Sequence, residues 1–183
     1  MVCYCGDCQS FAHFLGRANE ILDVHGGTEI FQTSPARLEI AQGQHRLACM
    51  RLTPKGMVRW YAECCRTPIG NTLITPQVPF VGLILLACTE ANAAGGSRDE
   101  VLGPVRARVN TGSAKGNAVE RGIRDSGMVP SLLRFARLVL QARLRGDHKA
   151  SPFFDPRTGQ PRATPRVLSG PELREVERRR DAA

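Results

Sequence analysis

Short apolar runs separated by turn-forming residues make up much of the first 110 residues. Pro35, Gly43 and Pro54 are examples of the residues that separate these runs. Short runs bounded by proline and glycine are typical of β-strands in a sandwich or a folded sheet. The pattern predicts strands at Glu29–Gln32, Arg37–Ala41, Leu47–Leu52, Met57–Glu63, Phe80–Cys88 and Val101–Val109.

The run Phe80–Cys88 is apolar at successive positions rather than at alternate ones. A strand with two apolar faces is typically buried on both sides, as a central strand is. We therefore expect this run near the middle of the sheet. The alanines and glycines of residues 91–98 predict a loop that ends the compact β region.

Three segments carry helical patterns. Residues Cys8–Leu15 group their apolar side chains near one face. Residues Ser131–Arg145 carry a polar stripe on an otherwise apolar helix, formed by Arg134, Arg137, Gln141 and Arg145. Such a helix usually packs on its own domain, and lying on a membrane surface is the alternative. Ser169 and Glu172 form a capping-box pattern that predicts a last helix to about Arg180.

The predicted fold class is mainly β, with antiparallel sheets and a helical extension at the C-terminus. We expect a β domain over residues 1–110, a flexible linker over 111–130, where glycine and small polar residues gather, and a basic helical extension over 131–183. No internal repeat is visible in the sequence.

The charge of the chain is concentrated in its C-terminal part. The chain of 183 residues has a formal net charge of +8. Residues 131–183 alone carry 12 Lys and Arg against 6 Asp and Glu. Such a basic surface can attract phosphates or an anionic membrane, or it can simply be solvated. One Trp and two Tyr, with no interleaving of aromatic and basic residues, argue against specific nucleic-acid binding.

Targeting features are absent from the sequence. No apolar run reaches the roughly 20 residues that cross a bilayer, and the N-terminus has no secretion signal. Seven cysteines, an odd number, without such a signal indicate a reducing cytoplasm where thiols can hold metal.

The most specific chemical signal is the run Cys3-Tyr4-Cys5-Gly6-Asp7-Cys8. Thiolates are strong ligands for zinc, and a C-x-C-x2-C run brings three of them to one point. Three protein ligands leave one corner of a tetrahedron open, which distinguishes a catalytic zinc site from a closed structural one. Cys8 would lie at the positive end of the first helix, where a thiol loses its proton more readily.

Cys64 and Cys65 are the candidates for a fourth ligand. Adjacent cysteines rarely bond to each other, so one of the pair can turn toward the metal. Cys49 and Cys88 stand in apolar surroundings, where a free thiol acts as a small hydrophobic side chain.

The triplet, together with the later stretch Cys65-Arg66-Thr67-Pro68-Ile69, resembles the glutathione-dependent formaldehyde-activating enzyme family. That family combines C-x-C-x2-C with a strand leading into C-x2-C-G-[ST]-P-[LIF]. The resemblance covers roughly residues 1–90 and implies a zinc-binding β-tent fold. It also implies carbon–sulfur lyase chemistry on a thiol–aldehyde adduct such as S-(hydroxymethyl)glutathione, with the catalytic zinc on Cys3, Cys5 and Cys8.

The sequence departs from the family at its second, structural zinc site. Ala62 takes the place of the first cysteine of the late pair, and Arg66 takes the place of a glycine. The family's early C-x-C is also missing, which suggests a true start upstream of Met1. The structural zinc is therefore not carried over to this chain.

No side chain stands out as a general base for that chemistry. His13 and His25 are the nearest candidates by residue type, although lone histidines are more often structural. Arg59 and Arg66 flank the Cys64-Cys65 turn and can receive the carboxylates of a glutathione-like substrate or form salt bridges.

Two other interpretations stay open at this point. With Cys65 or Cys64 as the fourth ligand, the zinc site is closed, and the chain is a zinc-stabilised binding or structural module. Alternatively, the triplet is a redox switch, because zinc thiolates can be oxidised and release their metal.

Overall fold

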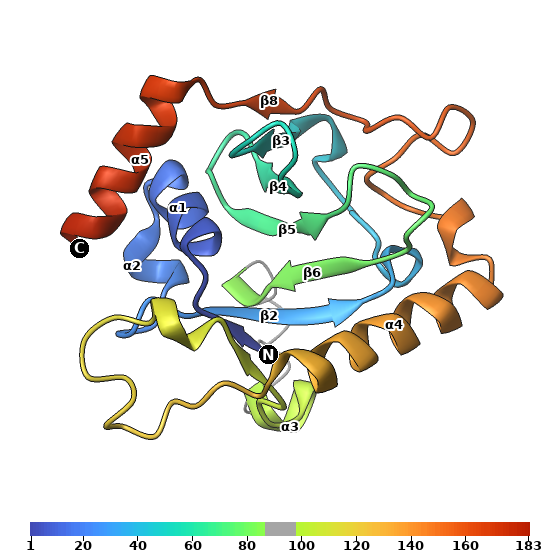
Figure 1. Cartoon of the computed structure of the whole chain (residues 1–183). Coiled ribbons are helices and arrows are strands. Elements are labelled where there is room, and N and C mark those ends of the chain that lie inside the picture. Colours follow the sequence, from blue (N-terminus) through green and yellow to red (C-terminus); the bar gives the residue numbers. More distant parts are fainter. Residues whose placement is uncertain (87–97) are drawn as a thin grey trace.

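One mixed sheet organises the computed structural model of the chain, which describes residues 1–86 and 98–183 (Figure 1). Its strand order is β7-β1-β2-β6-β5-β4-β3-β8. The inner strands pair antiparallel, whereas the edge strands β7 and β8 pair parallel with β1 and β3. The strands are β1 Val2–Cys3, β2 Thr28–Thr33, β3 Leu47–Arg51, β4 Val58–Ala62, β5 Pro68–Thr72, β6 Val81–Ile84, β7 Arg108–Val109 and β8 Arg166–Val167.

The predicted class, mainly β with a helical C-terminal extension, is confirmed. β6 lies between β2 and β5, as the apolar run at Phe80–Cys88 indicated. The last two residues of that run and the loop expected at 91–98 fall almost entirely among residues 87–97, which lie outside the described residues.

Two strand predictions were wrong, and the strands β1, β5 and β8 were not predicted. The segment expected as a strand at Arg37–Ala41 begins in the 3-10 turn η1, Pro35–Arg37, because the Ser34 hydroxyl caps the Ala36 N–H. β5 was missed because Pro68 was interpreted as a strand breaker, yet proline is tolerated as the first residue of a strand. Within Val101–Val109 only β7 is extended.

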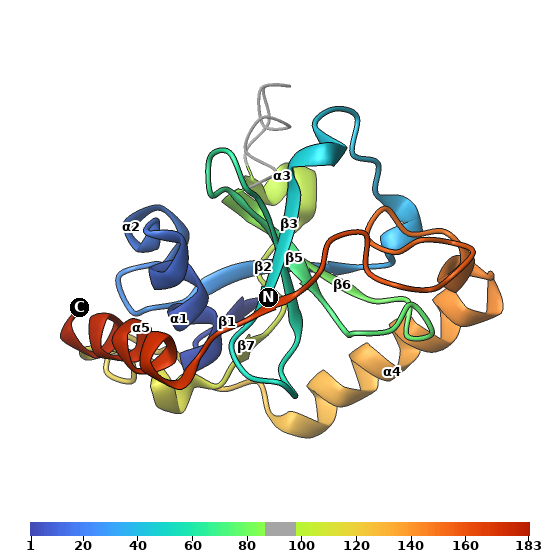
Figure 2. The same cartoon turned by 90° about the horizontal axis from the view of Figure 1, so that it is seen from above.

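The helices are α1 Gly6–Leu15, α2 Ala18–Ile21, α3 Arg98–Leu102, α4 Met128–Leu144 and α5 Gly170–Ala182. The capping box of Ser169 and Glu172 at the start of α5 is present as predicted. Figure 2 shows α5 beside α1, with α4 on the far side of the sheet. None of the helices in the described part of the chain has both the length and the apolar character needed to cross a membrane.

The sheet is buried on both faces, because alternate residues of β3 and β4 point to different core clusters. Met50 and Tyr61 belong to a cluster with Phe11 of α1 and Val176 of α5. On the other face, fully buried Trp60 packs against Phe153, with ring centroids 5.0 Å apart. The C-terminal extension therefore contributes to both cores.

The segment 111–130, expected as a flexible linker, contacts the N-terminal part of the chain. The amide of buried Gln9 donates to the carbonyl oxygens of Tyr4 (2.7 Å) and Ser113 (2.9 Å). The Lys115 ammonium donates to the carbonyl oxygen of Arg180 in α5. These bonds connect the start of this segment to both α1 and α5.

Candidate metal centre

The three N-terminal cysteines converge because a strand turns directly into a helix. Cys3 ends β1, Cys5 is the extended N-cap of α1 (φ −64°, ψ 149°), and Cys8 follows in the first turn. The Sγ of Cys5 accepts a hydrogen bond from the Cys8 N–H at 3.4 Å, so a thiol serves as the helix cap. All three sulfur atoms lie within 4.8 Å of one another.

These spacings suit a metal ion with thiolate ligands. A tetrahedral zinc with Zn–S bonds of about 2.3 Å holds its sulfurs roughly 3.8 Å apart. The Sγ atoms of Cys3 and Cys5 are 3.4 Å apart. The N-terminus of α1 adds a positive partial charge that stabilises thiolates. The Cys3–Cys5–Cys8 group can therefore hold a metal ion.

Hydrogen bonds favour a thiolate at Cys3. The thiols of Cys5 and Cys8 lower the pKa of Cys3 to about 3, and the Asn110 amide, 3.5 Å away, contributes. The pKa values of Cys5 and Cys8 are raised, because each donates its proton to Cys3 and a second negative charge would lie beside the first. The group therefore releases one proton easily, while a bound cation would favour release of the others.

The sulfurs line a cavity of about 450 Å³. Its apolar wall includes Met57, Phe80 and Ile30, and its polar wall includes Arg59 and Asn71. Since the three thiols come from one short turn at the wall, an additional ligand for a bound metal can approach from this cavity. A cavity of this size accommodates a small organic ligand.

Arg59 is the buried cation of this cavity. It is 3% exposed, and its guanidinium donates to the Asn71 side-chain oxygen and to the Asp7 carboxylate, both at 3.3 Å. The guanidinium also lies 5.5 Å from the centre of the Phe11 ring. Asp7, which lines the same cavity, is the carboxylate partner of Arg59 and is itself largely exposed.

Cys64 and Cys65, the candidates for a fourth ligand, do not lie near Cys3, Cys5 and Cys8. They are exposed in the turn between β4 and β5. That turn lies at the C-terminal end of α1, since the Arg66 guanidinium donates to the Phe14 carbonyl oxygen at 3.3 Å. The triplet lies at the other end of this ten-residue helix, roughly 15 Å away at 1.5 Å per residue.

The remaining candidates lie outside the cavity. Burial, followed by the charges of Lys115, Arg180 and Arg179, lowers the pKa of His13, which is in the last turn of α1. The His25 ring bonds the Lys115 carbonyl oxygen at 3.0 Å. Burial raises the pKa of Cys49 to about 12, so this thiol stays protonated, as its apolar surroundings indicated. Cys88 lies outside the described residues.

Asn110 and Asn71 are site residues that the sequence analysis missed. Asn110 has a left-handed backbone (φ 57°), a conformation that asparagine tolerates better than most residues. It follows β7, whose pairing with β1 brings it beside Cys3. An asparagine after a short strand does not by itself indicate a site residue in the sequence. Asn110 is recognised as one only because the long-range pairing of β1 with β7 places it beside Cys3.

Comparisons with known proteins are limited to one family. Searches of curated proteins and of solved structures found no match. A family of unknown function, DUF6151, matches residues 1–164. The chain therefore belongs to the DUF6151 family.

Proposed function

We propose that the chain binds zinc through Cys3, Cys5 and Cys8 and acts as a carbon–sulfur lyase on a thiol–aldehyde adduct. The observation that carries this proposal is the position of the three sulfurs at the wall of a cavity large enough for a small ligand. In the described part of the chain no fourth cysteine joins them. A site with three protein ligands and an accessible fourth position is typical of catalytic zinc.

The proposed chemistry is the reversible addition of a small thiol to an aldehyde, or the reverse cleavage. When bound, zinc lowers the pKa of a ligated thiol or polarises a carbonyl oxygen. In the forward direction the thiol gives its proton to solvent, the carbon–sulfur bond forms as the C=O π bond breaks, and the former carbonyl oxygen takes a proton from solvent. Histidine is absent from the cavity lining, so we assign no side chain as general base.

The residues around the sulfurs have distinct roles in this proposal. Arg59 binds a carboxylate of the substrate, because a buried guanidinium offers two parallel donors to such a group. Asn110 keeps Cys3 oriented through its hydrogen bond to that sulfur. Met57 and Phe80 exclude water from the reacting atoms. The formaldehyde-activating family that the sequence resembles handles a glutathione adduct, and we propose the same substrate class here, in a cytoplasmic setting.

Metal analysis tests the first half of the proposal. We expect about one zinc ion per chain in protein purified under reducing conditions. Cys5→Ser should abolish zinc binding, because it removes one of the three ligands, whereas Cys65→Ser at the far end of α1 should keep it. Zinc loss in Cys65→Ser but not in Cys5→Ser would contradict this assignment.

Exchange spectroscopy tests the second half. With glutathione and formaldehyde present, the zinc-loaded protein should accelerate formation and breakdown of the adduct, observed as exchange broadening in NMR spectra. Cys65→Ser is the matched control and should be as active as the unmodified chain. If the fully loaded protein gives no acceleration over buffer, the lyase proposal fails, and the module with structural zinc becomes the better interpretation.

A further inference from the structure

Helix α4 lies along the outer edge of β2, on the side away from β6 (Figure 1). β1 pairs with β2 at Thr28 and Glu29, and Met1 bonds the backbone of Ile30, so only the end of this edge beyond Ile30 is left to α4. The inner face of the helix is anchored by Phe135, whose ring centroid lies 5.0 Å from that of Phe80, and by buried Ala142. The orientation of α4 relative to the sheet is therefore fixed by packing.

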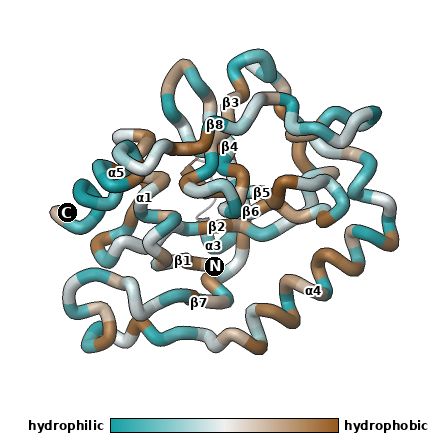
Figure 3. Tube along the Cα trace, turned by 45° about the horizontal axis from the view of Figure 1, so that its top comes forward, coloured by the Kyte–Doolittle hydropathy of each residue, from teal (hydrophilic) through white to brown (hydrophobic). Residues whose placement is uncertain are grey.

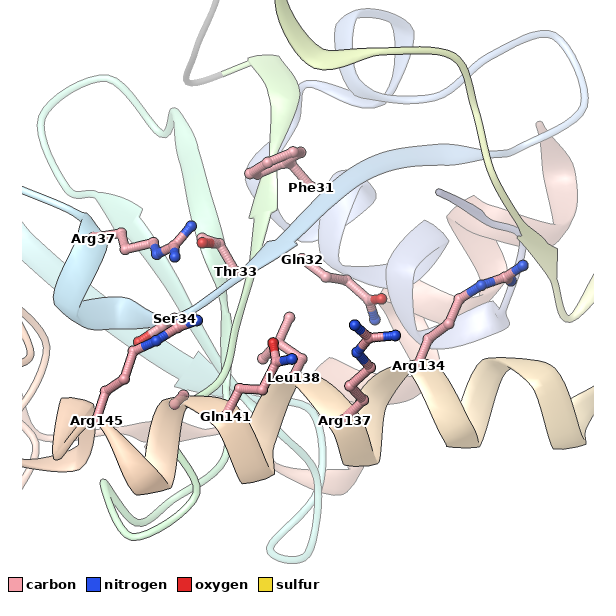
Figure 4. Close-up of a pocket in the computed structure, with 11 residues that line it drawn as sticks. Phe31, Gln32, Thr33, Ser34, Arg37, Arg134, Arg137, Leu138, Gln141 and Arg145 are labelled. Atoms are coloured by element: carbon pink, nitrogen blue, oxygen red, sulfur yellow. The ribbon is translucent and has the colours of Figure 1, made fainter.

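A basic groove of about 290 Å³ runs between α4 and the end of β2. Four arginines line it: Arg37, Arg134, Arg137 and Arg145. No acidic residue lines this groove, and among the described residues none of these four side chains has a carboxylate partner. Figure 4 shows Arg137 next to Gln32, while Arg37 and Arg145 approach each other near Ser34. Such a concentration of unpaired guanidinium groups favours an anionic ligand.

The outward face of the same helix is apolar and exposed. Val129, Leu133, Leu140 and Leu144 repeat at the spacing of one helix face, and each is at least 60% exposed. Met128 and Leu132 extend this surface and are exposed as well. The tube in Figure 3 shows the apolar positions recurring along α4. We call the four residues Val129, Leu133, Leu140 and Leu144 the apolar stripe.

We propose that α4 docks the protein on an anionic phospholipid bilayer, with the apolar stripe in the acyl boundary and the groove arginines on lipid phosphates. A helix with an apolar face and a basic flank lies in the membrane interface in this way. Of the groove arginines on α4, Arg137 is the one nearest the apolar stripe around the helix axis, because it precedes Leu140 by three residues and Leu144 by seven. Arginine binds phosphate oxygens through two parallel N–H donors.

Charge favours a membrane over a second copy of this chain. From Met128 to Gly146 the sequence contains four arginines and no acidic residue. Pairing two copies through α4 would bring two sets of these arginines together, which is unfavourable. An anionic bilayer supplies the opposite charge and the apolar environment at once. The groove borders the cysteine cavity, since Gln32 lines both, but the four arginines and the apolar stripe lie outside the cavity lining. This inference therefore does not depend on the proposed lyase activity.

Vesicle flotation with the full chain tests the proposal. The probe is a set of phosphatidylcholine vesicles with and without about one third phosphatidylserine, a composition that supplies the negative surface potential of a cytoplasmic leaflet. We expect the protein to float with the anionic vesicles only. Leu133→Ser/Leu140→Ser should abolish flotation through loss of the apolar contact. Circular dichroism should show an unchanged fold, because both side chains are exposed.

Arginine variants separate a specific groove from general attraction. Arg134→Gln/Arg137→Gln should weaken vesicle binding about 30-fold, as expected for two basic groups at the surface. Arg178→Gln/Arg179→Gln, which removes two exposed arginines of α5, is the matched control and should change binding less than threefold. Equal losses in the two variants, or no flotation of the unmodified chain, would overturn the proposal. A dimer in light scattering that the stripe variant dissociates would overturn it in favour of a second copy.

Discussion

Arg59 is the residue through which the metal centre would recognise an anionic substrate. Arg59→Lys keeps the charge but loses the planar pair of donors, so binding of a carboxylate should weaken while the sulfurs stay in place. We expect the KM for the glutathione–formaldehyde reaction to rise about tenfold, with little change in kcat. Arg66→Lys at the far end of α1 is the control. An unchanged KM in Arg59→Lys would mean that Arg59 only supports the structure.

Thiol reactivity should separate the cysteines by their environments. Hydrogen bonds from the Thr67 hydroxyl and N–H lower the pKa of exposed Cys65. At a given pH, a larger fraction of this thiol is therefore ionised than of an ordinary cysteine. Burial raises the pKa of Cys49 to about 12, which keeps it protonated at neutral pH. Cys65 should therefore be labelled within minutes by iodoacetamide at pH 7.5, and Cys49 only after unfolding. Peptide mapping by mass spectrometry measures both rates, and early labelling of Cys49 would contradict its buried position.

At the scale of elements, prediction from sequence worked where the signal was local. The first-turn position of Cys8 in α1, the capping box of α5 and the central position of β6 follow from short patterns. β5 was missed because a proline at the first position of a strand has the same local signal as a breaker.

Long-range placement explains the remaining errors. Cys64 and Cys65 were grouped with the N-terminal triplet because spacing in the sequence cannot show which end of α1 the β4–β5 turn approaches. Asn110 was missed for the same reason, since only the parallel pairing of β1 with β7 brings it to Cys3. The Cys3–Cys5–Cys8 group could be predicted from sequence because its residues lie within six consecutive positions of the chain.

The cap of α5 gives an element-scale prediction. The Ser169 N–H and hydroxyl donate to the Glu172 carboxylate, and the Ser169 side chain accepts from the Glu172 N–H. Removing the hydroxyl leaves that helix N–H without its partner. Ser169→Ala should cost about 1 kcal/mol of folding free energy, which lowers Tm by about 2–4 °C in a chain of this size. Arg178→Ala breaks only an exposed pair with Glu175 and should change Tm by less than about 1 °C. Calorimetry that ranks the two variants in the opposite order would show that the cap is not what stabilises the helix.

The whole molecule should unfold as one unit, because its C-terminal part completes both cores. β8 pairs with β3, Val176 packs in the α1 cluster, and Phe153 covers Trp60 on the opposite face. Removing residues 151–183 should therefore expose Trp60, the only tryptophan, and shift its fluorescence emission to longer wavelength. Phe153→Ala should keep the fold but cost about 3–5 kcal/mol, the usual effect of removing a buried aromatic ring. A truncated chain that kept a buried Trp60 and a sharp thermal transition would instead support a separately folding domain over residues 1–110.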